Sequence, residues 1–164
     1  MAFGDGTAVT SQPVSRLAEL SFFDGAWLGT GTFFFTASGR PKPIVMDIRN
    51  STGYEGNWVI THTRERRTAD NPDPLEATYF WGYDPARDVF VAEWFDSVGG
   101  RATQQSSGWD GDRLVFTGTM TSSGNSFTLR DTFTRRGHSR YHHIGEADFG
   151  TGWTTVDEEE VRRR

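Results

Sequence analysis

Short turn sequences interrupt the chain at regular intervals after residue 25, and this spacing limits the folds open to it more than any other feature. The turns are rich in Gly, Asn, Asp and Pro, as in "YDPARD", "VGG", "WDGD" and "SSGN". Such turns join antiparallel neighbours. Strand-like runs lie between them, at residues 26–36, 44–54, 57–66, 75–83, 88–97, 100–109, 112–121, 126–136, 138–147 and 153–163. The pattern predicts an all-β fold.

A single open sheet of that width would expose two long edges, which closure into a barrel removes. We therefore expect an antiparallel up-and-down β-barrel of about 8–10 strands, with a β-sandwich as the alternative. One short helix is expected at residues 15–23, because Leu17 and Leu20 recur at helical spacing after start signals at Pro13 and Ser15. Residues 1–13, rich in Gly, Thr and Ser, predict a flexible arm before a single domain at residues 14–164.

Composition and charge argue against several classes of function. The chain has 164 residues, a formal net charge of −5 and no cysteine, which excludes disulfides, thiolate metal sites and a cysteine nucleophile. The basic residues are spread along the chain, which argues against a nucleic-acid partner. Neither a signal peptide nor an apolar membrane span is recognised, so we expect a cytoplasmic protein without a membrane partner. No feature indicates an oligomeric state.

The stretch "DGAWLGTGTFFF", residues 24–35, opens the first predicted strand. Inward and outward residues alternate along a barrel strand, so Trp27 shares a face with Gly29, Gly31, Phe33 and Phe35. Glycine on such a face lets a strand bend sharply or lets a neighbouring side chain approach closely. We expect Trp27 to be a buried residue at the barrel floor, with the short helix beside it.

The Gly25-x-Trp27 motif after a short helix resembles the signature of the calycin superfamily, which includes lipocalins and fatty-acid-binding proteins. Its longer form, with Gly29 and Gly31, is similar to the nitrobindin pattern. A second stretch, "GYDPARDVFVAEWFDSVGG" followed by "GWDGDRLVFTG", resembles a bacterial lipocalin-like family of unassigned function. The lipocalin resemblance implies that Trp27 packs against an arginine of the last strand, which here is one of Arg162, Arg163 and Arg164.

The nitrobindin resemblance implies a haem held by a histidine of the last strand. Here that strand, "WTTVDEEEVRRR", contains no histidine. We therefore expect no cofactor and keep haem as a secondary alternative. A metal site is not predicted either, because His138 and His142 are too far apart along one strand to hold the same ion.

Apolar faces of the predicted strands should point into the barrel and form the wall of a pocket for an apolar ligand. Ile44, Met46 and Ile48 share such a face, as do Leu114 and Phe116. The residues predicted to bind the ligand are Phe33, Phe35, Met46, Tyr79, Phe116, Met120, Phe133 and Tyr141.

Charged side chains on these faces are the candidates for chemistry. Asp131 is the one charge on an apolar stripe. It either lies near the rim or pairs with a neighbouring arginine, or it is a buried carboxylate with a raised pKa. His62 shares a face with Trp58 and Ile60, which favours an inward imidazole. In "RYHHIGE", either His142 or His143 must face inward, and the predicted catalytic set is His62, Asp131, His142 and His143.

The last strand leaves two alternatives open. Its inward acidic residues are either Asp157 and Glu159 or Glu158 and Glu160, unless these residues extend beyond the rim.

These residues suggest an enzyme that holds a largely apolar organic molecule and moves a proton without a cofactor, as in cyclisation, isomerisation or dehydration. A carrier barrel without chemistry is the alternative, and a nitrobindin-like haem protein is the second alternative.

Overall fold

The protein is described by a computed structural model over residues 15–164, so the arm predicted at residues 1–13 lies outside the described residues. Its strands are β1 (Gly25–Phe33), β2 (Lys42–Gly53), β3 (Trp58–Glu65), β4 (Glu76–Asp84), β5 (Val89–Asp96), β6 (Arg101–Ser106), β7 (Trp109–Asp110), β8 (Arg113–Ser122), β9 (Asn125–Arg135), β10 (Arg140–Asp148) and β11 (Trp153–Arg163). The all-β prediction is confirmed. The run predicted at 100–109 is split into β6 and β7 at Gly108, whose φ of 105° breaks the strand.

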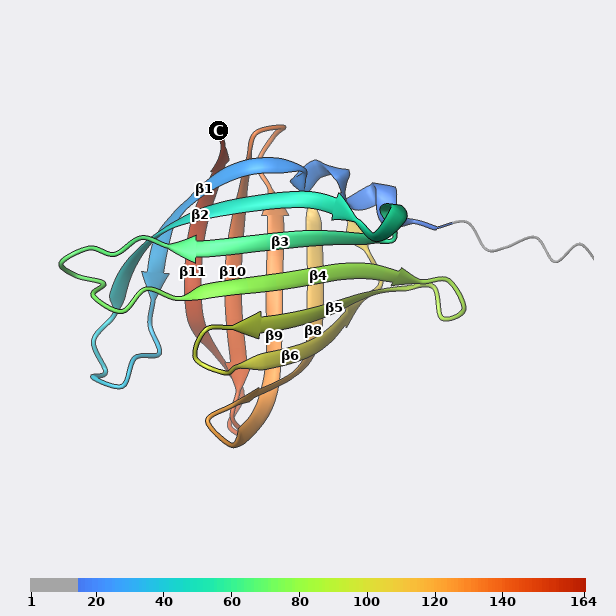
Figure 1. Ribbon diagram of the computed structural model, residues 1–164. Helices are drawn as coiled ribbons and strands as arrows, with labels where there is room; N and C mark the ends of the chain where they lie inside the picture. Colours follow the sequence, from blue (N-terminus) through green and yellow to red (C-terminus); the bar gives the residue numbers. More distant parts are fainter. Residues whose placement is uncertain (1–14) are drawn as a thin grey trace, which may run out of the picture.

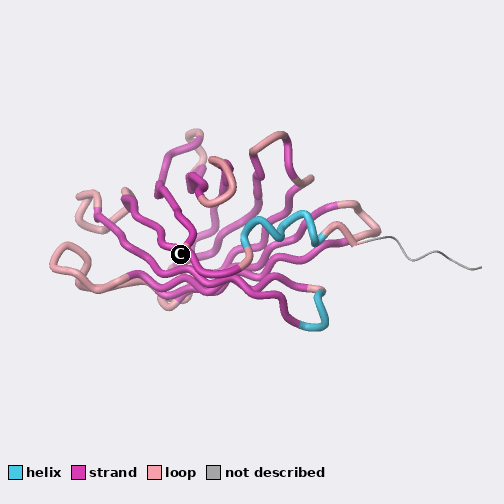
Figure 2. The backbone as a smooth tube through the Cα atoms, turned by 90° about the horizontal axis from the view of Figure 1, so that it is seen from above, coloured by secondary structure: helices cyan, strands magenta, loops and turns pink. Residues whose placement is uncertain are grey.

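The strands form one closed antiparallel barrel. Each long strand pairs with its neighbours in the chain, while β1 pairs with β11 and β6 pairs with β8 to complete the ring. β2 to β5 run across the front in Figure 1 and β8 to β11 run almost crosswise behind them. Figure 2 shows how strongly the sheet curves. The sandwich alternative is wrong, because one continuous hydrogen-bonded sheet encloses the core and leaves no edge among the long strands.

A short 3-10 helix, η1 (Leu17–Phe23), covers one end of the barrel, and the predicted N-terminal helix is confirmed. Leu17, Leu20 and Phe23 are its buried residues. The Phe23 ring stacks on Trp109 at 5.7 Å and meets the edge of Trp81 at 4.9 Å. A lone 3-10 turn, η2 (Tyr54–Gly56), is the other helical element in residues 15–164, where no helix has the length and apolar character of a membrane crossing.

Trp27 lies at this floor, as the sequence predicted, and is fully buried. Its indole N–H donates to the carbonyl oxygen of Phe23 over 2.7 Å, which satisfies the polar atom of the ring. The guanidinium of Arg163 lies 4.2 Å from the indole centroid and donates to the carbonyl oxygens of Phe22 and Asp24. Arg163 is therefore the arginine of the last strand that packs on Trp27 and ties β11 to the helix.

The glycines after Trp27 make room for atoms of neighbouring strands. A β-carbon on Gly29 would lie 2.8 Å from Cγ of Met46, and one on Gly31 would clash with the backbone carbonyl oxygen of Glu158. The bare positions of β1 are thus filled from β2 and β11.

Candidate functional site

A cavity of about 1100 Å³ occupies the barrel above the floor residues. Its lining reaches the turns at the end of the barrel opposite η1, where Phe35 stacks on Phe149 with ring centroids 4.9 Å apart. Seven of the residues predicted to bind the ligand line this cavity: Phe33, Phe35, Met46, Tyr79, Met120, Phe133 and Tyr141. The prediction for Phe116 is wrong. That ring is fully buried and stacks on Trp81, which separates it from the cavity.

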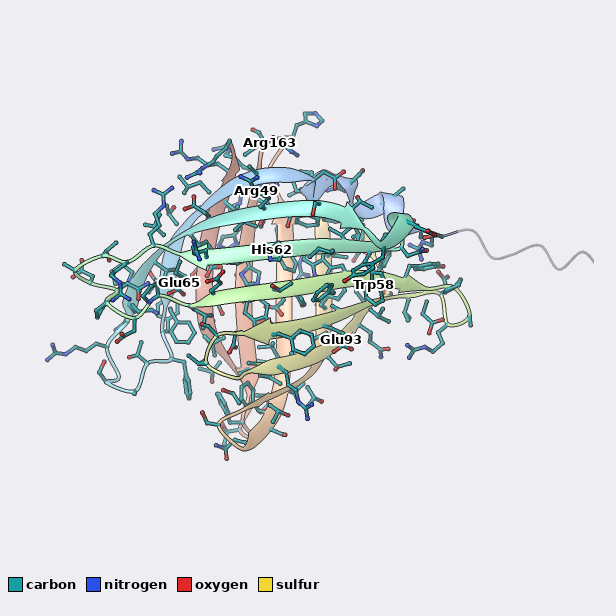
Figure 3. All side chains as sticks on the ribbon, viewed as in Figure 1. Arg49, Trp58, His62, Glu65, Glu93 and Arg163 are labelled. Atoms are coloured by element: carbon teal, nitrogen blue, oxygen red, sulfur yellow. The ribbon has the colours of Figure 1, made fainter. Side chains whose placement is uncertain are left out.

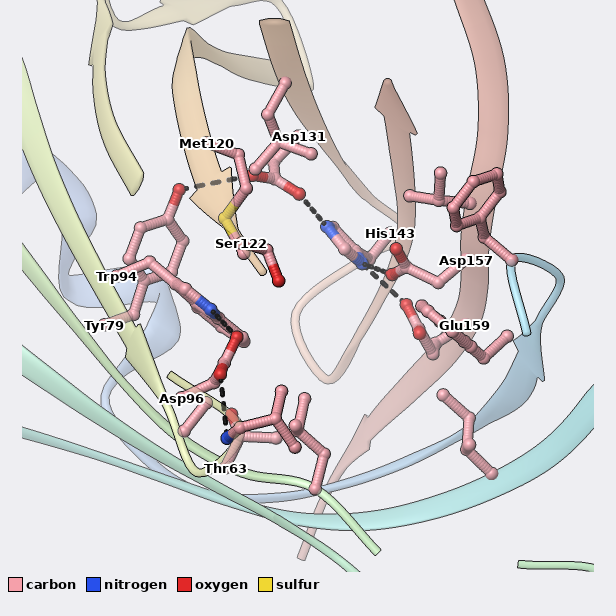
Figure 4. A pocket seen from close by; sticks show the side chains of 18 of the residues that line it. Thr63, Tyr79, Trp94, Asp96, Met120, Ser122, Asp131, His143, Asp157 and Glu159 are labelled. Carbon is pink, nitrogen blue, oxygen red and sulfur yellow. Dashed lines mark hydrogen bonds and ion pairs between the residues drawn. The ribbon is translucent and has the colours of Figure 1, made fainter. Parts of the chain in front are cut away.

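His143 of β10 is the centre of a polar network on the cavity wall (Figure 4). Its Nε2 lies 3.0 Å from Oδ1 of Asp131 on β9. On the other side of the ring, Nδ1 lies 2.6 Å from Oε2 of Glu159 and 3.3 Å from Oδ2 of Asp157, both on β11. The Phe133 ring packs 4.7 Å from the imidazole. Both ring nitrogens are therefore held by carboxyl groups.

Asp131 connects this histidine to the opposite side of the barrel. Its Oδ2 accepts a hydrogen bond from Nε2 of Gln104 over 2.7 Å and another from the Tyr79 hydroxyl over 3.3 Å. The Tyr79 hydroxyl also donates to Oε1 of Gln104. Gln104 and Tyr79 are themselves buried. Asp131 is thus a buried hydrogen-bonded carboxylate facing the cavity, and the alternative that placed it at the rim is wrong.

The strand register explains why these groups meet. His143 pairs with Glu159 and with Phe133, and the next inward position of β10, Gly145, pairs with both Asp157 and Asp131. The imidazole can therefore reach diagonally to either carboxylate across a position that carries no side chain. Diagonal neighbours on one face lie within reach of such side chains.

Burial and neighbouring charge shift the pKa values of this network in opposite directions. Burial raises the pKa of Glu159, and the adjacent Asp157 charge raises it further, to about 8. Burial would also raise the pKa of Asp157, but contact with the His143 imidazolium outweighs it and lowers that pKa. For His143, burial lowers the pKa, but Glu159, Asp131 and Asp157 outweigh it and raise the pKa well above its ordinary value. The pKa values of Asp157 and Glu159 are thus displaced in opposite directions within one network.

Two of the predicted catalytic histidines lie on the outside of the barrel. His62 is exposed on the outer face of β3, and its Nδ1 lies 3.2 Å from the hydroxyl of Thr78 on β4 (Figure 3). The inward orientation predicted for it is wrong, because Val59, Thr61 and Glu65 form the inward face instead. Trp58 and Ile60 are the half-buried apolar residues of the outer face.

His142 likewise points away from the cavity. Its Nε2 lies 2.7 Å from Oε1 of the half-exposed Glu158. Strand alternation places these two residues outside and His143 inside. The alternative with Asp157 and Glu159 facing inward is therefore the one that the structure supports.

Gln104 is the network residue that the sequence prediction missed. It sits in "RATQQS", a strand whose buried positions are Ala102, Gln104 and Ser106. No apolar stripe marks that face. Gly118 of the paired strand β8 lies against the backbone of Thr103 and Gln104, which marks a close approach of the two strands and not the polar side chain.

His143, Asp157 and Glu159 also form the group in residues 15–164 that could hold a metal ion, with ligand atoms within 4.8 Å of one another. A haem group fits the cavity less well than a metal ion does. His143 is the histidine that lines the cavity in this part of the chain, and a bond to haem iron would replace a carboxyl partner at one ring nitrogen. The haem alternative therefore has no free imidazole among the cavity residues.

Comparison with known proteins bears on the fold. No family model matches the chain, and no curated protein matches it. The structure is similar to the crystal structure of Rv2717c from M. tuberculosis, with a TM-score of 0.70 and 14% sequence identity over 90% of this chain and 96% of that chain. At this identity the likeness concerns the fold alone, a closed antiparallel barrel.

Proposed function

We propose that this protein binds a largely apolar small organic molecule inside the barrel and transforms it by acid–base chemistry without a cofactor. The observation that carries the proposal is the pair formed by Asp157 and Glu159 on the cavity wall. Their environments push their pKa values apart, as expected where one carboxyl group acts as base and its neighbour as acid.

The chemistry follows from the positions of the protons. Asp157, ionised, removes a proton from a carbon or oxygen atom of the bound molecule, and Glu159 gives a proton to another atom of it. Nδ1 of His143 faces both carboxyl groups, so it can carry the proton gained by Asp157 back to Glu159. The proton count of the protein is then unchanged, which suits an isomerisation. In a dehydration, Glu159 would protonate the leaving hydroxyl group.

Asp131 is a positioning residue in this proposal. It fixes Nε2 of the imidazole and is itself fixed by Gln104. The Phe, Met and Leu side chains of the wall hold an apolar body close to these groups, and a cavity of about 1100 Å³ is large enough for a molecule of drug size.

A carrier barrel without chemistry is the second candidate, because the cavity alone supports binding. Two measurements separate the candidates. Fluorescence of the neutral dye Nile red reports binding. Ultraviolet absorbance reports isomerisation of a polycyclic β,γ-unsaturated ketone to its conjugated form, which needs one proton removed and one returned.

Asp157→Asn and Glu159→Gln should abolish the isomerisation while keeping the dye bound, and the outward Glu158→Gln should leave both unchanged. Equal isomerisation by all variants, or none by the parent protein across a panel of such ketones, would favour the carrier. Failure of Nile red to bind would contradict the use of the cavity altogether.

A further inference from the structure

The charges that line the cavity are almost all of one sign. The acidic side chains are Glu65, Asp96, Asp131, Asp148, Asp157 and Glu159. Within residues 15–164, no arginine or lysine side chain joins them on the wall. A barrel that holds a carboxylate ligand would be expected to place a cation there, because a buried charge needs a partner.

Three of these acidic side chains accept hydrogen bonds from groups of the protein near the mouth of the barrel. Glu65 accepts hydrogen bonds from Lys42 at 3.1 Å and from the side chain of Asn71 at 2.8 Å. Asp96 and Asp148 each accept two backbone N–H groups of the turn that follows them. These three are satisfied without a ligand.

The other three share a single cation. Asp131, Asp157 and Glu159 all surround His143. Three carboxyl groups thus face one imidazole, so acidic groups outnumber basic groups on this part of the wall. An anionic ligand would add negative charge to a poorly solvated site, whereas a cationic group would offset the acidic groups.

Asp157 is the group of this cluster that is best placed to receive a ligand. Its side chain is 21% exposed, against 13% for Asp131 and 3% for Glu159. Its Oδ2 lies 3.3 Å from Nδ1 of His143, and its carboxylate also hydrogen-bonds with Glu159, which has the shorter contact with the imidazole at 2.6 Å. A carboxylate offers about four acceptor sites, so acceptor capacity remains for a ligand in the cavity.

A second observation also points to a ligand. The Oδ1 atom of Asn50 and the Oγ1 atom of Thr61 are buried on the cavity wall, and neither has a hydrogen-bond partner within residues 15–164. These residues are 5% and 6% exposed and face each other across β2 and β3. Buried polar atoms are nearly always satisfied, so a molecule in the cavity, either a ligand or ordered water, would supply their partners.

We infer that the ligand of this cavity is an apolar molecule that carries one protonated amine, and that the amine binds against Asp157. This inference rests on the proposed function, since it needs the cavity to be the binding site. Within that proposal it names the chemical class of the ligand. The ammonium group would supply the missing positive charge, and the apolar body would pack on the aromatic and aliphatic walls.

A matched set of probes tests the charge directly. Naphthylmethylamine, naphthylmethanol and naphthoate share one ring system and differ in carrying a positive, neutral or negative group. Each is used to displace Nile red from the full chain, in buffer with EDTA so that no metal ion mediates binding. We expect the amine to bind at least about tenfold more tightly than the alcohol, and the carboxylate to bind most weakly.

Two variants locate the effect. Asp157→Asn keeps the shape and removes the charge, so the preference for the amine should fall to within about twofold of the alcohol. Glu158→Gln removes one charge from the outer face of the same strand and should keep the preference. If Asp157→Asn does not fold, as judged by circular dichroism, the ranking of the three probes on the parent protein still decides the charge of the ligand.

The outcomes separate this inference from the proposed function. Displacement by the alcohol or carboxylate as readily as by the amine overturns the inference and leaves the cavity as a binding site. A preference for the amine that survives in Asp157→Asn overturns the role of that residue. If Nile red does not bind to the parent protein, the proposed function fails and the inference fails with it.

Discussion

A β-carbon on Gly145 would lie 2.8 Å from Cγ of Asp157, so the carboxylate occupies the space that a side chain at position 145 would need. Gly145 stands between Asp131 and Asp157 in the register of β9, β10 and β11. Its missing side chain lets the imidazole of His143 reach both carboxylates. The glycine is thus part of the site although it offers no chemical group.

Two other members of the network lie on strands that approach a glycine closely. A β-carbon on Gly31 would meet the carbonyl oxygen of Glu158 and the Cα and Cγ atoms of Glu159, and one on Gly118 would meet the backbone of Thr103 and Gln104. Glycine at these points lets the backbones of neighbouring strands come together. The first strand motif therefore serves the site as well as the floor.

We predict that Gly145→Ala displaces Asp157 without disturbing the rest of the barrel. The added methyl group overlaps the carboxylate, and overpacking of this kind costs about 1–3 kcal/mol of unfolding free energy. With Asp157 moved away, His143 loses one of the contacts that raise its pKa, so its pKa should fall. Urea denaturation measures the first effect and the NMR titration of the imidazole measures the second.

Gly29→Ala is the matched control for this variant. Its methyl group would meet Cγ of Met46 at 2.8 Å, the middle of a flexible side chain away from His143. It should change stability by a similar or smaller amount and leave the imidazole titration unchanged. Equal titrations in the two variants would contradict the role given to Gly145.

The network also predicts how stability depends on pH. The pKa of Glu159 is about 8 in the folded protein against 4.5 for the free side chain, so between these values the folded state holds a proton that the unfolded chain has lost. Stability therefore falls as the pH rises through that window. The raised pKa of His143 acts in the same direction, since its contribution is full below about pH 6.5 and is lost as the pH rises through the folded value.

Glu159→Gln should remove part of this dependence, because an amide resembles the protonated carboxyl group and does not ionise. We expect the variant to lose less stability than the parent between about pH 5 and pH 9, with a difference of more than about 1 kcal/mol. Glu158→Gln on the outer face should follow the parent. Parallel curves for Glu159→Gln and the parent would show that Glu159 does not hold its proton in this range.

Much of the fold was predictable because its signals are local. The hairpin turns, the short helix and the Trp27 motif each depend on a few adjacent residues, and the regular spacing of the turns favours closure. Strand alternation also placed most of the cavity wall correctly. It failed for Phe116, because alternation gives the face of a residue but not the neighbour that covers it, here Trp81.

The site was only partly predictable because its contacts join distant strands. Alternation limited β10 to His142 or His143 and β11 to two pairs of acids, yet the choice depends on the register with β9. For His62 the pattern misled, since β3 carries apolar residues on its outer face too. Gln104 and Asp131 are 27 residues apart in the sequence, so no local sequence pattern could predict the hydrogen bond between them.

We predict that the aromatic pair at the mouth controls how fast a ligand leaves. Phe35 is 58% exposed and stacks on Phe149, and both rings line the cavity. Phe149→Ala removes one side of that pair and should raise the dissociation rate of Nile red several-fold in stopped-flow fluorescence. Phe34→Ala is the control, because Phe34 is exposed next in sequence but does not line the cavity. An identical rate for both variants would contradict the gating role.

Trp27→Ala should destabilise the barrel by about 3–5 kcal/mol, as expected for truncation of a fully buried large aromatic residue. The loss includes the contact with Arg163 and the hydrogen bond to the carbonyl of Phe23. Trp153→Ala is the comparison. Because Trp153 is 39% exposed on the outer surface, its truncation should lower the free energy of unfolding much less. Thermal and urea unfolding followed by circular dichroism measure both, and a melting temperature for Trp27→Ala within a degree or two of the parent would refute the floor role.

The last prediction separates the four residues that the sequence singled out for chemistry. His143→Gln and Asp131→Asn should lower kcat for ketone isomerisation by about 10²–10⁴, because the first removes the proton carrier and the second frees it from its fixed orientation. His62→Gln and His142→Gln should leave kcat within about twofold, since both imidazoles lie outside the cavity. Because Asp131 acts through His143, the double variant that carries both His143→Gln and Asp131→Asn should have a kcat no lower than His143→Gln alone.

Nile red binding, measured in parallel, shows whether a variant still forms the cavity. A loss caused by His62→Gln with dye binding intact would place the chemistry on the outer surface, and unchanged turnover in all four would leave a barrel that carries its ligand without altering it.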